Sequence, residues 1–158
     1  NRFTKNPDII LLKNGKMLLT YCDVDRHWSL ENQIIILLAS DDQGKTWYKF
    51  KEIDQAILKN GDERFITPRL SLLNDERLAI IVDHDDDCHF HENQPSGNWI
   101  YWSSDYGETW KLQKQTKILG FEPDRIINID KNTLCVTTHL MIAETQEFAQ
   151  IFWVSINK

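Results

Sequence analysis

Short runs of apolar residues, each followed by a tight polar turn, recur along the whole chain. The first run covers residues 6–12, turns at Asn14-Gly15 and continues over 17–21. Residues 67–82 and 122–138 repeat this order: a proline, an apolar run, a polar turn and a second apolar run. Runs of about four to eight residues, rich in β-branched side chains and bounded by turn residues, are typical of β-strands. The pattern therefore predicts three β-hairpins, and Asn-Gly is a strong turn signal because both positions tolerate positive φ.

Each hairpin is followed by a third apolar run, and two copies then share one eight-residue turn. The third runs cover residues 33–39, 99–102 and 148–154. The turns that begin at Ser40 and Ser103 both read Ser-x-Asp-x-Gly-x-Thr-Trp. A fourth run starts at the tryptophan of each turn. The repeat thus predicts four antiparallel strands per copy, with one weak helical turn expected at residues 54–59.

Four-stranded units repeated at this period are the signature of a β-propeller. We expect an all-β fold in one partial domain, just under three four-stranded antiparallel blades. Blade 1 is expected at about residues 5–52, blade 2 at about 64–115, and an incomplete blade 3 at about 121–158. Propellers close with about four to eight blades. We therefore expect the chain to be a piece of a longer propeller; closure with a second copy, as a homodimer, is the alternative.

Composition and charge narrow the function classes. The chain has 158 residues, of which 41% are hydrophobic and 27% charged, enough for one folded domain with a core. Its formal net charge of −6 argues against a nucleic-acid partner, because phosphate contacts need clustered Lys and Arg. No apolar run is long enough for a membrane span. The three cysteines have neither disulfide-framework nor zinc-site spacing, so they indicate no compartment, and the sequence implies no cofactor.

Each residue type in the eight-residue turn has a predicted structural role. The aspartate accepts hydrogen bonds from the turn, the glycine supplies a positive φ, and the threonine hydroxyl closes the turn. The tryptophan places a large apolar side chain between sheets. The residues concerned are Asp42, Gly44, Thr46 and Trp47 in the first copy and Asp105, Gly107, Thr109 and Trp110 in the second. The turn is therefore interpreted as a stabilising device; a calcium site at these aspartates is the weaker alternative, since too few carboxylates converge.

These turns resemble Asp boxes, also called BNR repeats. Together with the surrounding pattern they make nearly the whole chain similar to the sialidase (neuraminidase) superfamily of propellers. The resemblance implies about six blades, with structural Asp boxes that lie away from the active site. It implies part of a sialidase-like glycoside hydrolase that acts on terminal sialic-acid-type sugars of glycans. Asp boxes also occur in non-catalytic propellers, so a glycan- or protein-binding propeller is the alternative.

The antiparallel order assigns the loops to two ends of the blades. The hairpin turns and the eight-residue turns lie at one end, named here the back. The start of each first strand and the loops at about 23–31, 83–98 and 139–147 lie at the other end, the front. All five histidines fall at the front: His27, His84, His89, His91 and His139. Clustered titratable groups favour a functional site there, although long loops are also often simply polar.

The resemblance implies particular roles for some of these residues. Asp25 lies where the family has its proton-donating aspartate, beside Arg26, whose charge favours the ionised carboxylate. Arginines would hold the sugar carboxylate, but Lys5-Asn6-Pro7 stands where the family has Arg-Ile-Pro. The candidate substrate contacts are Arg26, His27, Trp28, Arg64, Arg69, Asp83, His84 and Arg125. The three later arginines could instead be surface or inter-blade residues, and the family's Tyr–Glu nucleophile pair is expected beyond Lys158.

A mixed acidic segment and three tryptophans complete the candidate features. Residues 84–92 mix carboxylates, imidazoles and a thiol, but without a recognised ligand spacing, so a solvated acidic loop is preferred over a metal site. Trp99 and Trp102 are expected to pack within a strand, whereas Trp28 is expected to stack on a sugar. The expected partner is a glycan or sialoglycoconjugate, with no metal involved.

Overall fold

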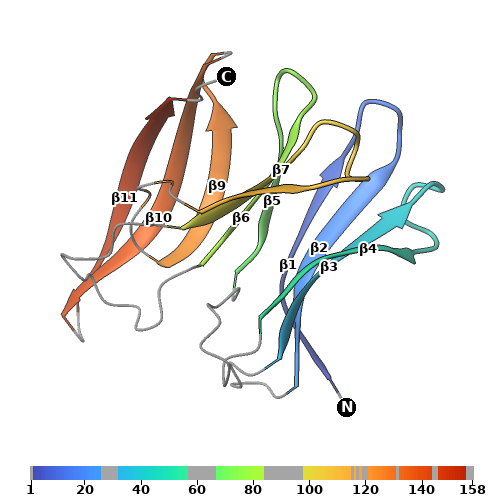
Figure 1. The fold of residues 1–158 in the computed structure, drawn as a ribbon, viewed down its shortest axis with the longest axis horizontal. Coiled ribbons are helices and arrows are strands. Elements are labelled where there is room, and N and C mark those ends of the chain that lie inside the picture. Colours follow the sequence, from blue (N-terminus) through green and yellow to red (C-terminus); the bar gives the residue numbers. More distant parts are fainter. Residues whose placement is uncertain are drawn as a thin grey trace.

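A computed structural model describes residues 2–25, 32–56, 67–83, 98–114, 116, 118, 121–130, 132–143 and 146–155. Every regular element in these ranges is a β-strand, and they form three antiparallel sheets (Figure 1). Within the same ranges, no helix is long and apolar enough to cross a membrane. The chain is an all-β protein whose sheets are successive blades of a partial β-propeller, as the repeat predicted.

The first blade has the strand order β1-β2-β3-β4. Its strands are β1 (Phe3–Leu11), β2 (Met17–Val24), β3 (Gln33–Ser40) and β4 (Tyr48–Ala56). Burial along β2 alternates strictly, because one face packs on the next blade while the other is more open. The third strand is largely buried and holds the centre of the sheet between β2 and β4.

The second blade has the order β5-β6-β7-β8, and the third has β9-β10-β11. The strands are β5 (Arg69–Leu72), β6 (Leu78–Val82), β7 (Trp99–Ser103), β8 (Lys111–Gln113), β9 (Phe121–Asn128), β10 (Thr133–Ala143) and β11 (Gln146–Ser155). All five residues of β6 are buried, because this blade lies between two others and both of its faces are covered. Its continuous apolar run therefore has the pattern of a strand buried on both sides.

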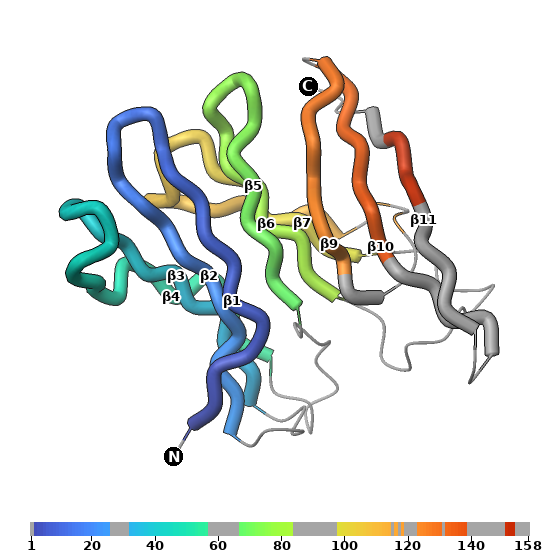
Figure 2. The backbone as a smooth tube through the Cα atoms, turned by 180° about the vertical axis from the view of Figure 1, so that it is seen from behind, coloured from blue at the N-terminus to red at the C-terminus, as the bar shows by residue number. Residues whose placement is uncertain are grey.

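The hydrophobic core consists of two layers between the blades. One cluster joins the facing sides of blades 1 and 2, with Leu37 and Ile80 among its fully buried members. The other joins blades 2 and 3 and includes Ile81 and Val136. The first strands β1, β5 and β9 lie on the same side of the molecule, and β5 contacts both of its neighbours (Figure 2). They form the inner edge of the propeller, and the blades fan outward from it.

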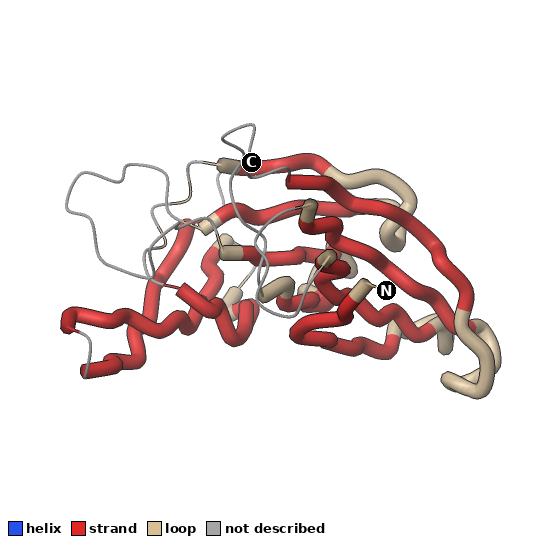
Figure 3. The backbone as a smooth tube through the Cα atoms, turned by 90° about the horizontal axis from the view of Figure 1, so that it is seen from below, coloured by secondary structure: helices blue, strands red, loops and turns tan. Residues whose placement is uncertain are grey.

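The sequence placed most strands correctly, but two predictions were wrong. The helical turn expected at 54–59 is strand β4 through Ala56, and the remaining residues lie outside the described ranges. The loops after the second strands were expected from Asp23 and His139 onward. Instead, β2 continues to Val24 because Asp23 still pairs with Thr4 and Ile34. His139 lies inside β10, paired with Phe121 and Ala149. Figure 3 shows how far the strands extend along each blade.

Candidate functional site

The back of the first two blades is built by the eight-residue turns, which have the predicted geometry. Asp42 accepts hydrogen bonds from the Thr46 backbone N–H at 2.8 Å and the Thr46 hydroxyl at 2.7 Å. The Ser40 hydroxyl donates to the same carboxylate at 2.8 Å and accepts from the Gly44 N–H at 2.8 Å. The φ of Gly44 is +83°, a region that glycine enters without steric cost. These bonds hold the pKa of Asp42 down at about 2.

The second turn, which begins at Ser103, repeats these contacts and also packs against blade 1. Asp105 accepts from the Thr109 N–H at 2.9 Å, and the same kinds of bond lower its pKa to about 2. A Cβ on Gly107 would lie 3.3 Å from both Leu37 and Phe50 of blade 1. Trp110 packs against the core cluster between blades 1 and 2. The two aspartates have an ordinary role as acceptors in the turn, so the back is a structural end of the molecule.

The front of blade 1 holds a cluster of charged and polar side chains around Arg2. Its guanidinium donates to the Asp23 carboxylate at 2.7 Å, to the Asp25 carboxylate, and to the backbone oxygens of Asp23 at 3.1 Å and Asn32 at 2.9 Å. The Asn32 amide donates to the other oxygen of Asp25 at 2.6 Å. Side chains in this cluster are 21 to 39% exposed, so solvent reaches it. Neither Arg2 nor Asn32 was among the site residues predicted from the sequence; the available signal was that Arg2 precedes the first strand at the same end as Asp25.

Asp25, the candidate proton donor, therefore lies at the front, as expected, with both carboxylate oxygens accepting hydrogen bonds. In this arrangement Arg2 makes four hydrogen bonds with its five N–H donors and orders the segment that carries Asp25. A guanidinium held by four protein oxygens has little capacity left for an additional anion. Arg2 is thus suited to positioning Asp25 rather than to holding a substrate carboxylate.

Two other candidates lie at the front of blade 2. Arg69 begins β5, and Asp83 follows the last residue of β6 and is almost completely buried. Trp99, the first residue of β7, is 3% exposed and packs in the core between blades 1 and 2, as the sequence predicted. Trp102 is partly buried, and its indole N–H donates to Gln113 at 2.9 Å. Neither tryptophan is presented as an open stacking surface for a sugar.

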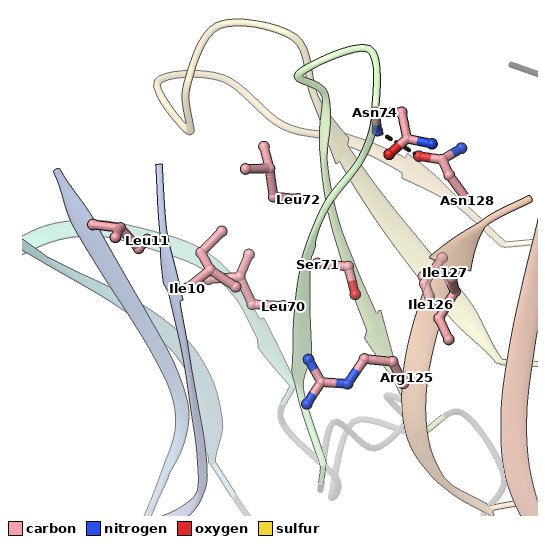
Figure 4. Close-up of a pocket in the computed structure, with 10 residues that line it drawn as sticks. All are labelled: Ile10, Leu11, Leu70, Ser71, Leu72, Asn74, Arg125, Ile126, Ile127 and Asn128. Atoms are coloured by element: carbon pink, nitrogen blue, oxygen red, sulfur yellow. Dashed lines mark hydrogen bonds between the residues drawn. The ribbon is translucent and has the colours of Figure 1, made fainter. Parts of the chain in front are cut away.

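Arg125 lies apart from the front cluster, in a cleft between the inner strands. This cleft has a volume of about 360 Å³ and is lined by β1, β5 and β9 residues (Figure 4). Its walls are mostly aliphatic, with Leu70, Leu72 and Ile126 among them. Arg125 extends from β9 toward the opening between β9 and β5 (Figure 4). This arginine thus lies in a cleft between the first strands of the blades, and none of the residues that line it belongs to the Arg2 cluster around Asp25.

The remaining predicted site residues lie outside the described ranges: Arg26, His27, Trp28, Arg64 and His84, with the whole segment 84–92. Among the described residues, no group of three His, Cys, Asp or Glu side chains could hold a metal ion. Cys22 is buried, which raises the pKa of its thiol to about 12, so it is not a candidate nucleophile. The described chemistry is therefore limited to the front cluster, Arg69, Asp83 and the axial cleft.

No protein-family model and no curated protein sequence matches this chain. Solved structures do match it. An α-L-arabinofuranosidase from Fusarium graminearum, in complex with an iminosugar inhibitor, aligns with a TM-score of 0.66 and 18% identity over 97% of this chain and 45% of that one. An α-L-arabinanase from Penicillium chrysogenum, complexed with arabinobiose, aligns at 0.65 and 19% identity over 97% and 46%. A protein of unknown function from Dyadobacter fermentans aligns at 0.61 and 16% identity over 94% and 40%.

At these identities the likeness establishes the fold and nothing narrower. The chain spans less than half the length of each of these structures. The sequence, the sheet topology and the comparisons agree that this chain forms successive blades of a β-propeller.

Proposed function

We propose that this chain forms part of a propeller glycoside hydrolase that acts on glycans at the front end of its blades. The observation that carries the proposal is the cluster of Asp25, Asp23, Arg2 and Asn32 at the front of blade 1. Support also comes from similarly folded structures that include an arabinofuranosidase and an arabinanase. Glycoside hydrolysis commonly uses a pair of carboxylic acids, one of which protonates the leaving oxygen.

Asp25 is our candidate for that proton donor. Each of its oxygens accepts one of the hydrogen bonds described above, from Arg2 or from Asn32, and keeps a second lone pair that can carry the proton. Both partners can therefore stay in place and keep the carboxyl group oriented. Arg69, which begins β5 at the front of the next blade, is proposed to contact the sugar. Asp83, which follows β6 there, is 2% exposed, so its proposed role is to support that end of the site from within the blade.

The narrower proposal is an exo-sialidase-like activity on terminal sialic-acid-type sugars, which the eight-residue turns support if they are true Asp boxes. An arabinofuranoside is the competing substrate, since one similar structure is an α-L-arabinofuranosidase and another is an α-L-arabinanase. A panel of fluorogenic glycosides, offered to the full-length protein, separates the two. Release from a sialoside alone supports the narrower proposal, and release from an arabinofuranoside alone replaces it.

A propeller that binds glycan without cleaving it is the second candidate. It is favoured by the same cluster, because Arg2 and Asn32 each hydrogen-bond one oxygen of Asp25, an arrangement that orders this end of the blade without any proton transfer. Glycan-array binding without hydrolysis of any member of the panel would establish it and overturn the hydrolase proposal.

A further inference from the structure

The axial cleft contains a buried hydroxyl that has no hydrogen-bond partner in the described part of the chain. Ser71, on β5, is 4% exposed, and its Oγ atom is fully buried. Figure 4 shows this hydroxyl pointing from β5 toward β9. A buried polar group without a partner costs free energy, about 1–3 kcal/mol in mutational studies. Such a group inside a cleft is explained most simply by a ligand that supplies the missing hydrogen bond.

The second feature of the cleft is the guanidinium of Arg125, which has no described hydrogen-bond or ion-pair partner. Arg125 is the only charged residue among those that line the cleft, and it forms no hydrogen bond or ion pair with any described residue. Asp8, on strand β1, does not form an ion pair with it; its two oxygens accept from the backbone N–H groups of Ile9 and Leu70, each at 2.9 Å. The cleft therefore presents a guanidinium that has no ion-pair partner among the described residues, together with a hydroxyl group that can donate.

Two asparagines, Asn74 and Asn128, also line the cleft, at the end away from Arg125 (Figure 4). Asn128 accepts from the Asn74 backbone N–H at 2.7 Å and donates to the backbone oxygen of Asp130 at 3.2 Å. The remaining lining is aliphatic: Ile10, Leu11, Leu70, Leu72, Ile126 and Ile127. Ser71 and Arg125 beside these aliphatic walls suit an amphipathic ligand whose charged end lies at Arg125.

We propose that this cleft binds a small organic carboxylate with a short aliphatic body. The planar guanidinium of Arg125 matches both oxygens of a carboxylate, and Ser71 Oγ can donate to one of them. The isoleucine and leucine walls take the aliphatic part. A sugar fits poorly, because its hydroxyl groups would lose water against walls that offer no hydrogen bonds. A free phosphate fits poorly as well, since one exposed cation would face a doubly charged ion beside apolar side chains. This site is independent of the proposed hydrolase function.

The test measures binding of 3-methylbutanoate to the full-length protein by ligand-detected NMR titration. Neutral 3-methylbutanamide and inorganic phosphate are the matched probes. We expect the carboxylate to bind about tenfold more tightly than the amide or phosphate, as a charge-assisted pair requires. Arg125→Gln should weaken its binding about tenfold, and Ser71→Ala by a few-fold. Arg77→Gln serves as the control, because Arg77 pairs with Asp75 at the back, outside the cleft.

The proposal would be overturned by any of four results: equal binding of the acid and the amide, tighter binding of phosphate, no binding of the carboxylate, or an equal effect of Arg77→Gln and Arg125→Gln.

Thermal unfolding adds a separate readout. Because Ser71 Oγ has no described partner, Ser71→Ala should leave the ligand-free protein at least as stable as the unchanged protein. The same variant should show a smaller rise in Tm on addition of 3-methylbutanoate. A clear loss of ligand-free stability would assign the hydroxyl to the fold instead of a ligand. If Ser71→Ala fails to fold, that result counts against the proposal in the same way.

Discussion

The hydroxyl of Tyr101 donates a 2.6 Å hydrogen bond to the carboxylate of Asp54, joining blade 2 to the outer strand of blade 1. Tyr101 is 3% exposed and belongs to the core cluster shared by these blades. Its ring therefore fills the layer between the two sheets while its hydroxyl ties β7 of blade 2 to β4, the outer strand of blade 1. The contact combines packing and polar pairing at a single inter-blade position.

Replacing Tyr101 with phenylalanine keeps the ring and removes this bond. We expect Tyr101→Phe to lower the free energy of unfolding by about 1–2 kcal/mol, because a partly buried carboxylate loses its donor. The matched control is Tyr106→Phe, which removes a 2.9 Å bond to Glu76 from a tyrosine that is 46% exposed. We expect about 0.5 kcal/mol or less for that control. Urea denaturation measures both, and equal losses would contradict the inter-blade role.

The glycines of the turns allow backbone strain and packing to be separated. Gly15 has φ +86° and no heavy atom within 4 Å of an added Cβ, so Gly15→Ala should cost only the strain of that φ, about 1 kcal/mol. Gly107 has φ +93°, and an added Cβ would also press on Leu37 and Phe50. We expect Gly107→Ala to lower the free energy of unfolding by about 1 kcal/mol more than Gly15→Ala. Thermal and urea unfolding of the two variants provide the comparison, and a larger effect at Gly15 would be inconsistent with this packing.

The turn aspartates should make stability depend on acid pH. The pKa values of Asp42 and Asp105 are lowered from 3.8 to about 2, mainly by hydrogen bonds from Thr46 and Thr109. A carboxyl group whose pKa is lower in the folded state stabilises the fold fully above its unfolded-state pKa and loses that effect as pH falls through its folded-state pKa. We expect unfolding midpoints in urea to fall between about pH 4 and pH 2. The pair of substitutions Asp42→Asn and Asp105→Asn should flatten this part of the profile, and an unchanged slope would contradict the assignment.

The Arg2 cluster should order the beginning of β1 more than it stabilises the whole protein. Arg2 is 39% exposed on its side chain, so Arg2→Gln should lower the free energy of unfolding by about 1 kcal/mol or less. Amide hydrogen exchange should rise at Phe3 and Thr4, and stay unchanged at Ile10. Lys13→Gln, which breaks a 2.7 Å pair with Glu76 at the back, is the control. Faster exchange along all of β1 in the Arg2 variant would show a global effect instead.

Much of this fold could be predicted from the sequence because its signals are local. The proline, run and turn pattern places β5 to β7 within one or two residues, and the bonds from Thr46 and Thr109 follow from the turn motif itself. Strand ends were less predictable. Whether β10 stops at Thr138 or continues to Ala143 depends on pairing with β11, which no short pattern specifies.

The site was harder to predict for the same reason. Asp25 was found from its place after a second strand, but the partners that occupy it, Arg2 and Asn32, come from other segments. Arg125 was a candidate substrate contact, yet nothing in the sequence indicated that Ser71 would be buried near it in a mostly aliphatic cleft. Such juxtapositions arise only when blades pack against one another.

The most direct test of the proposed hydrolase is the turnover of the full-length protein with Asp25→Asn, compared with Asp75→Asn at the back hairpin. The substitution at Asp25 removes the ionisable group and keeps the shape and one hydrogen-bonding oxygen. On whichever fluorogenic glycoside the unchanged protein hydrolyses, we expect Asp25→Asn to lower kcat by about 100-fold or more, as loss of a general acid does. Asp75→Asn should leave kcat within about twofold, because its partner Arg77 lies away from the front. Unchanged turnover in the folded Asp25→Asn variant would contradict the account.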